Sequence, residues 1–253
     1  MDPTALQQSL SEAMQHQAAG RYAQAEQIYR NILQDDPSQP AALHLLGVLA
    51  HLAGQSETGV DLIRTAIANA PDYFAAYNNL GNVYRGQGKL EQAAACYRDA
   101  IEIKPDYAEA HCNLGLVLQH NGEMDAARAS FEEAIASKPD YAEAQCNLGT
   151  VLQKSGMLEE AVRNYQSALA SAPNFARAHR CLGNVFELMG RYERSIASYR
   201  QSLALEPDSV EALGGLGSAL LASGNTEEGL QLERKGFGMV RFDLEQGVSV
   251  EKR

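Results

Sequence analysis

The amino-acid sequence predicts an all-α solenoid of about seven stacked helix–turn–helix hairpins, because three series of residues recur every 34 positions. The first series is a glycine, preceded by Asn-Leu in its middle copies: Gly47, Gly81, Gly115, Gly149, Gly183 and Gly217. The second series is also glycine: Gly20, Gly54, Gly88, Gly122, Gly156, Gly190 and Gly224. The third series is proline: Pro37, Pro71, Pro105, Pro139, Pro173 and Pro207. Three independent series with one period indicate a repeat protein.

The period defines a repeat unit with the first glycine at position 8, the second at position 15 and the proline at position 32. The units are 6–39, 40–73, 74–107, 108–141, 142–175, 176–209 and 210–243. A first helix is expected over positions 1 to about 14, because apolar residues such as Ala76, Leu80 and Val83 follow a period of 3.6. The glycine at position 15 would end this helix, since glycine adopts a positive φ at little cost.

A second helix is expected after that glycine, as from Leu90 to Ile103, and the proline at position 32 would end it. Some first helices are expected to begin with capping boxes of the D-x-x-E kind. These pairs are Asp106 with Glu109, Asp140 with Glu143, and Asp208 with Glu211. Each unit is therefore predicted to be a hairpin of two antiparallel helices.

Small residues at positions 8 and 20 predict a close approach of the two helices in each hairpin. Position 24 supplies the large partner: Tyr29, Ile63, Tyr97, Phe131, Tyr165 and Tyr199. Fully burying one such side chain contributes roughly 1.5–3 kcal/mol. One hairpin cannot bury these side chains alone, so neighbouring hairpins must stack.

The two ends depart from the pattern, so the sequence predicts four segments. Residues 1–39 are expected to be an N-terminal capping hairpin, residues 40–209 five regular hairpins, and residues 210–236 a degenerate hairpin with Glu233 at position 24. Residues 237–253 are predicted to be a tail or the start of a further domain. Within them, residues 239–242 and 248–250 are each expected to be a strand, a docked extension or part of a frayed tail. The apolar stretch 236–240 suggests that this chain or a partner packs against it.

This pattern resembles the tetratricopeptide repeat family over about residues 6–236. The period, the small residues, the aromatic at position 24, an alanine at position 27 and the proline at position 32 all match. The resemblance implies a right-handed superhelix whose first helices line the concave side. The Asn-Leu-Gly phrase is most similar to repeats that precede the catalytic region of O-GlcNAc transferases and SPINDLY-type enzymes, and to related bacterial proteins. No catalytic region of that kind is recognised in the sequence.

Composition argues against several classes of partner. The formal net charge is −11, which disfavours nucleic acid and anionic membranes, because both need an excess of Lys and Arg. No leader is recognised at the N-terminus, and no stretch approaches the ~18 apolar residues of a membrane span. The four cysteines, Cys96, Cys112, Cys146 and Cys181, lack CxxC pairing and are predicted to be free thiols in a reducing compartment. We therefore expect a cytoplasmic location and no membrane insertion.

The residues expected to bind a partner lie on one side of the first helices. In the family this side carries positions 2, 5, 6, 9, 12 and 13, and helical spacing places them together. The candidate peptide-binding residues occupy positions 5, 6 and 9: Asn78, Asn79, Asn82, Asn113, Asn147, Thr150, Arg180 and Asn184.

Asn79, Asn113 and Asn147 all stand at position 6 and suggest a ladder of amides. An asparagine amide offers a donor and an acceptor, so it can satisfy both the N–H and the C=O of an extended peptide. Stacked hairpins would set the amides on the order of 10 Å apart, close to the length of three extended residues. The resemblance implies this role, because the matching asparagines of O-GlcNAc transferases bind peptide main chain. The alternative is that the three amides are solvated or hydrogen-bond to the neighbouring hairpin.

Other candidate chemistry is weaker. A metal site formed by Cys112, Cys146 and Cys181 with His120 is not expected, because we expect the repeat spacing to be too long for shared Zn–S bonds of ~2.3 Å. His44 and His51, seven residues apart on the same side, are expected to be ordinary surface residues and not a catalytic or pH-sensing site. No catalytic residue, metal or cofactor is predicted.

The sequence therefore predicts a non-catalytic scaffold that binds an extended peptide or partner segment of a protein. One alternative is that the chain is the substrate-recognition region of a larger protein-modifying enzyme, similar to a glycosyltransferase. A second alternative is a structural role through self-association of the end hairpins.

Overall fold

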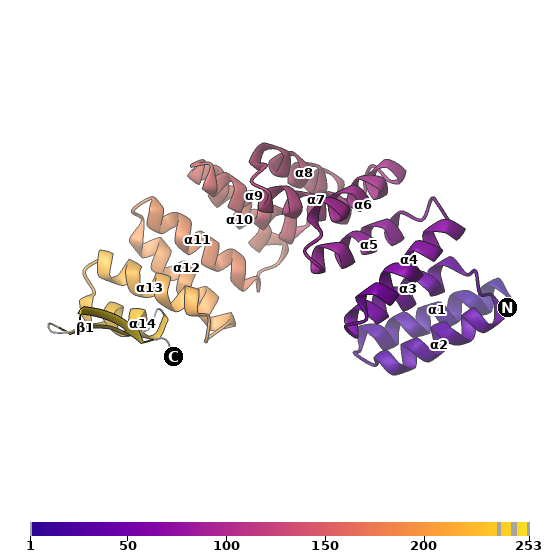
Figure 1. The fold of residues 1–253 in the computed structure, drawn as a ribbon. Coiled ribbons are helices and arrows are strands. Elements are labelled where there is room, and N and C mark those ends of the chain that lie inside the picture. Colours follow the sequence, from indigo (N-terminus) through magenta and orange to yellow (C-terminus); the bar gives the residue numbers. More distant parts are fainter. Residues whose placement is uncertain (1, 237–238, 244–246, 252–253) are drawn as a thin grey trace. The chain divides into compact units, whose positions relative to one another are not determined.

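The computed structural model of the protein describes residues 2–236, 239–243 and 247–251, and these residues form fourteen α-helices and two β-strands (Figure 1). Contacts within the chain divide it into two units, Met1–Ser137 and Lys138–Arg253. The helices of the first unit are α1 (Pro3–Ala18), α2 (Tyr22–Asp35), α3 (Pro40–Leu52), α4 (Ser56–Asn69), α5 (Phe74–Gly86), α6 (Leu90–Ile103), α7 (Ala108–His120) and α8 (Met124–Ser137). The helices of the second unit are α9 (Ala142–Lys154), α10 (Leu158–Ser171), α11 (Ala176–Leu188), α12 (Tyr192–Leu205), α13 (Val210–Ala222) and α14 (Thr226–Gly236).

Within each unit, successive helices pack as antiparallel hairpins that stack on their neighbours (Figure 1). In the first unit the hairpins α1/α2, α3/α4, α5/α6 and α7/α8 are joined by the contacts α2/α3, α4/α5 and α6/α7. In the second unit α9/α10, α11/α12 and α13/α14 are joined by α10/α11 and α12/α13. First helices of adjacent hairpins also touch, as α3 does α5 and α9 does α11. The prediction of an all-α stack of helical hairpins is confirmed.

The turn inside each hairpin follows from the glycine at position 15. Gly88, for example, has a φ of +73°, and all seven glycines of this series have positive φ. The Lys89 N–H donates to the Tyr84 carbonyl over 2.9 Å, and the Gly88 N–H donates to the Arg85 carbonyl over 3.0 Å. These bonds satisfy carbonyls at the end of α5, as in a Schellman motif, and reverse the chain into α6.

The close approach of the two helices depends on the glycine at position 8. A Cβ atom added to Gly81 would lie 2.5 Å from Cε1 of Tyr97, and one added to Gly149 would lie 2.7 Å from Cε1 of Tyr165. Both tyrosine side chains are fully buried. The pairing of small and large residues is therefore a steric requirement of the hairpin.

The expected capping boxes are wrong. The helices α7 and α9 begin after Tyr107 and Tyr141, and neither of these N-cap residues accepts a side-chain cap bond. The residue before α13 is Ser209, whose Oγ accepts the Ala212 N–H over 3.4 Å. Asp106, Asp140 and Asp208 instead stand one residue too early, because the turn after each proline uses an extra residue.

Two short strands follow the last helix in the described residues. Strand β1 (Met239–Asp243) pairs antiparallel with β2 (Gly247–Glu251), with Val240 opposite Val250. The strand interpretation of the tail is thus confirmed. The expected packing of the apolar stretch 236–240 involves residues 237 and 238, which lie outside the described residues.

A candidate binding face on the first helices

All eight predicted site residues lie on first helices. We call the side that carries positions 5, 6 and 9 of these helices the A-helix face. Asn78 and Asn147 are buried, with exposed fractions of 5% and 6%, whereas the other six are half-buried. The set is Asn78, Asn79 and Asn82 on α5, Asn113 on α7, Asn147 and Thr150 on α9, and Arg180 and Asn184 on α11.

In the first unit, position 6 hydrogen-bonds to position 5 of the preceding hairpin. Asn113 Nδ2 donates to Asn78 Oδ1 over 3.0 Å. Asn79 Nδ2 lies 2.7 Å from His44 Nε2. We call such a contact between residues 35 positions apart a cross-hairpin pair. One predicted alternative, hydrogen bonding to the neighbouring hairpin, is therefore present for these two asparagines.

His44 differs from the expectation of an ordinary surface histidine. Its side chain is 2% exposed, and its Nδ1 lies 3.1 Å from the Tyr73 hydroxyl. Burial lowers the pKa of His44 to about 4, so the ring is neutral at pH 7. Since Asn79 Nδ2 is a donor, a neutral ring accepts at Nε2 and donates from Nδ1 to the hydroxyl of Tyr73. The surface expectation fails because position 5 points at the next hairpin.

Position 9 supplies a partner for the buried tyrosine at position 24. The Tyr97 hydroxyl donates to Asn82 Oδ1 over 2.9 Å, and the Tyr199 hydroxyl donates to Asn184 Oδ1 over 2.6 Å. The Tyr165 hydroxyl lies 3.3 Å from Thr150 Oγ1. A buried hydroxyl needs such a partner, which gives these polar residues a structural role.

The sequence carries a signal for this role that helical periodicity alone does not reveal. Among units two to six, those with tyrosine at position 24 have Asn82, Thr150 or Asn184 at position 9, whereas unit one combines Tyr29 with Met14. The unit with Phe131 has Leu116 there, and the unit with Ile63 has Val48. A polar residue at position 9 thus accompanies a hydroxyl at position 24 in these five units. Position 12 was expected on this side, but its bonds to the tyrosines were not predicted: Gln153 Oε1 and Glu187 Oε2 accept from Tyr165 and Tyr199 over 3.0 and 2.9 Å.

In the second unit the same register carries different chemistry. Asn147 Oδ1 accepts a hydrogen bond from the guanidinium of Arg177 at position 2 of the next hairpin. Cys146 and Cys181, at positions 5 and 6 of adjacent hairpins, form a cross-hairpin pair between α9 and α11, and their thiols influence one another's pKa. The sequence predicted only that the repeat spacing is too long for shared metal ligation, and the pair itself follows from the contact between α9 and α11.

This pair does not amount to a metal centre. Among the residues that the structure describes, no group of three or more His, Cys, Asp or Glu side chains is placed to hold a metal ion. All four cysteines are free thiols, and Cys181 is the one that is not fully buried.

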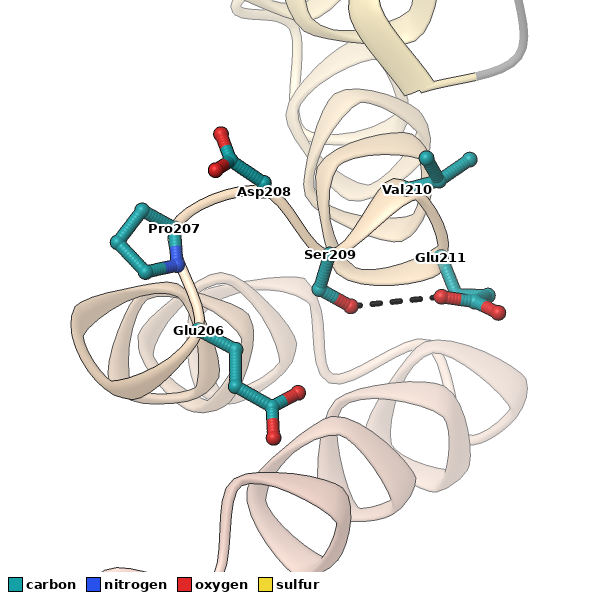
Figure 2. A pocket seen from close by; sticks show the side chains of 6 residues that line it. All are labelled: Glu206, Pro207, Asp208, Ser209, Val210 and Glu211. Carbon is teal, nitrogen blue, oxygen red and sulfur yellow. Dashed lines mark hydrogen bonds between the residues drawn. The ribbon is translucent and has the colours of Figure 1, made fainter.

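Pockets occur at the loops between hairpins. One of about 500 Å³ lies where α12 turns into α13 (Figure 2) and is lined by Glu206, Pro207, Asp208, Ser209, Val210 and Glu211. In it Ser209 Oγ lies 3.4 Å from Glu211 Oε2. The three carboxylates, two on the loop and one in the first turn of α13, are exposed and form no catalytic pair of acid and nucleophile, and none of the predicted site residues lines the pocket.

The hairpin stack, the positive-φ glycines and the interlocked glycine–aromatic pairs define a helical-repeat protein. Family models described as tetratricopeptide repeat match residues 16–83, 106–174 and 188–236, and one described as TPR repeat matches residues 81–122. The chain belongs to the tetratricopeptide repeat family.

Solved structures agree with this assignment. TTC0263, a thermophilic TPR protein of Thermus thermophilus, is 30% identical, with 72% of this chain and 98% of that chain covered and a TM-score of 0.60. PilF of Pseudomonas aeruginosa is 20% identical, with 81% and 94% covered and a TM-score of 0.73. YrrB, described as a TPR protein with an unusual peptide-binding site, is 19% identical, with 73% and 95% covered and a TM-score of 0.58. The comparison with curated proteins finds no match.

The helices are short relative to a bilayer. Of the helices that the structure describes, none combines the length and the apolar character needed to cross a membrane.

Proposed function

We propose that this chain is a non-catalytic interaction scaffold whose A-helix face binds an extended peptide segment of a partner protein. The observation that carries the proposal is the half-buried amide of Asn113. Its Nδ2 is held by Asn78, and within the described residues its Oδ1 accepts no hydrogen bond. A fixed amide with a second N–H and an open acceptor suits a peptide main chain.

The cross-hairpin pairs support the proposal through preorganisation. Asn79 is oriented by His44, and its Oδ1 accepts from Asn82 over 3.3 Å. A side chain already held in one orientation loses less conformational entropy when a ligand binds. Asn78 and Asn147 are buried, so in this proposal they position their neighbours. Asn79, Asn82, Asn113, Thr150, Arg180 and Asn184 offer the contacts to peptide.

A peptide selected from a displayed random library provides the probe. Replacement Asn113→Leu keeps the size of the side chain and removes its hydrogen bonds. We expect the Kd of the selected peptide to rise about tenfold, equivalent to about 1.4 kcal/mol. Fluorescence anisotropy measures the Kd, and circular dichroism checks the fold.

The matched control is Asn164→Leu. Asn164 lies on the second helix α10 and donates to Glu160 O of its own helix over 3.0 Å. This variant should bind as the wild type does. Equal affinity of a folded Asn113→Leu variant, or failure of the library to yield any binder, would refute peptide binding by these amides.

One alternative is that the chain is the substrate-recognition region of a larger protein-modifying enzyme. The triplet Asn-Leu-Gly at residues 79–81, 113–115 and 147–149, similar to O-GlcNAc transferase repeats, favours it. Reading the gene beyond the codon for residue 253 separates this alternative from a free-standing scaffold, since a catalytic region would follow in the same reading frame.

A second alternative is self-association through the end hairpins. Met14 on α1 is 53% exposed and Leu230 on α14 is 50% exposed, which leaves apolar side chains at both ends. Light scattering over a range of concentrations tests it, and a constant monomer mass would exclude it. We also propose a cytoplasmic location, supported by the four free thiols, which cell fractionation would test.

A further inference from the structure

The thiols of Cys146 and Cys181 form a contact that the peptide-binding proposal does not use. Cys146 belongs to α9 and Cys181 to α11, two helices that are in contact within this unit. The contact follows from the register of the repeat. The corresponding pairs in the first unit, His44 with Asn79 and Asn78 with Asn113, meet at 2.7 and 3.0 Å. At the α9/α11 contact both positions hold cysteine, so the same geometry yields a dithiol.

The two thiols have unequal surroundings. Cys146 is completely buried, whereas Cys181 is half-buried. Cys181 has the thiol of Cys146, the hydroxyl of Tyr165 and the guanidinium groups of Arg180 and Arg177 as neighbours. The Cys146 thiol does most to lower the pKa of Cys181, and the two arginines lower it further against the opposing effect of burial. Cys181 and burial raise the pKa of Cys146, whereas Arg177, which is also its neighbour, lowers it.

A two-cysteine oxidation site needs two thiols in different surroundings, one that attacks the oxidant and one that then forms the disulfide. The attacking sulfur must be a thiolate within reach of solvent. The second sulfur must lie in contact with the first and remain protected until the first has reacted. Cys181 meets the first condition, and Cys146 meets the second.

We propose that Cys181 and Cys146 form a redox-active dithiol that hydroperoxides convert to a disulfide joining α9 to α11. The Cys181 thiolate attacks the terminal oxygen of the hydroperoxide. An S–O bond forms, the O–O bond breaks, and the leaving oxygen takes a proton and departs as water or an alcohol. Cys181 thereby loses two electrons to the peroxide and becomes a sulfenic acid. Cys146 then loses its proton and attacks Cys181 Sγ, so that an S–S bond forms and the hydroxyl leaves as water.

The other thiols provide internal references. Cys96 on α6 is buried, and burial together with the neighbouring Asp99 raises its pKa to about 11. Cys112 on α7 is also buried. Both should therefore react far more slowly than Cys181 with peroxide at neutral pH.

The test uses the full chain, hydrogen peroxide as the probe, and peptide mass spectrometry after alkylation of the remaining thiols in denaturant. We expect one disulfide, between Cys146 and Cys181, to form about tenfold or more faster than Cys96 is oxidised. A thiol reductant should restore both thiols. Loss of Cys181 at the rate of Cys96, or oxidation of Cys181 without a bond to Cys146, would overturn the proposal.

Variants separate the two roles. Cys146→Ser should leave a sulfenic acid on Cys181 that dimedone traps, and Cys181→Ser should leave Cys146 reduced. Cys96→Ser is the matched control and should form the disulfide at the wild-type rate. Disulfide formation is measured in the wild-type protein, so the proposal remains testable even if a variant fails to fold. Equal dimedone labelling of Cys181 in wild type and Cys146→Ser would rule out Cys146 as the resolving thiol.

Discussion

The A-helix faces of the two units share one register and differ in the side chains that occupy it. In residues 1–137 the cross-hairpin pairs are imidazole with amide and amide with amide, at His44/Asn79 and Asn78/Asn113. In residues 138–253 the pair is thiol with thiol, at Cys146/Cys181. The repeat thus determines which positions of adjacent hairpins are in contact, and the residue types determine the chemistry of that contact. The first unit holds neutral hydrogen-bonding groups, and the second holds an oxidisable pair beside two arginines.

The hairpin core should be equivalent in both units, and removal of its aromatic side chain tests this most strongly. Tyr97→Ala and Tyr165→Ala should each lower the free energy of unfolding by about 3–5 kcal/mol, because both fully buried rings leave a cavity. Urea denaturation followed by circular dichroism measures the change. The control Tyr22→Ala, at a side chain that is 51% exposed, should stay within about 0.5 kcal/mol of wild type. A clearly smaller loss at one core site would show that the two units are not packed alike.

Acid should affect the first unit through His44. Its folded-state pKa of about 4 lies below the value of about 6.5 expected in the unfolded chain. Stability from the neutral ring is therefore fully present above pH ~6.5 and is lost as the pH falls toward 4, because the unfolded state binds the proton first. The free energy of unfolding should fall by up to about 1.4 kcal/mol per pH unit within that window.

Comparison with His44→Gln isolates this effect. The variant lacks the titrating ring, so its pH dependence between 4 and 6.5 should be flatter than that of the wild type. Urea midpoints at several pH values measure both curves. Parallel curves would mean that another group causes the acid sensitivity.

The link between positions 9 and 24 should hold across units. Phe131→Tyr places a hydroxyl opposite Leu116, as the unit alignment indicates, and should cost about 1 kcal/mol because position 9 offers it no partner and only Gln119 at position 12 remains. Adding Leu116→Asn recreates the arrangement of Tyr97 with Asn82 and should recover most of that loss. Thermal unfolding of the single and double variants measures the coupling. A double variant no more stable than Phe131→Tyr would disprove it.

Local rules were enough for the hairpins and insufficient for their helix starts. The glycine at position 15 needs a positive φ, and the glycine at position 8 faces an aromatic ring. Both requirements recur in each hairpin, so both glycines recur in the sequence every 34 residues. The capping boxes failed because a one-residue shift of the helix start moves Asp106 out of capping distance. Such a shift depends on the turn geometry, which residue type alone does not encode.

The proposed peptide-binding residues lie together on the first helices, as their spacing predicted. Hydrogen bonding to the neighbouring hairpin was one expected alternative, but the particular partners of Asn79 and Asn113 were not predicted. Helical periodicity brings positions 5, 6 and 9 to one face, so Asn79 and Asn113 could be found by spacing. Their bonds to His44 and Asn78 join different hairpins, and the offset between stacked hairpins is not a property of one helix.

The sequence by itself determined the repeat length, the helical hairpin, the buried aromatic residues and the side of the first helices that carries the polar groups. These features follow from periodicity and from local steric rules that act within a single unit. Only the tertiary structure decided that His44 is buried and that Cys146 meets Cys181. The reason is that stacking brings together residues 35 positions apart, and the distance between their side chains depends on how the hairpins pack.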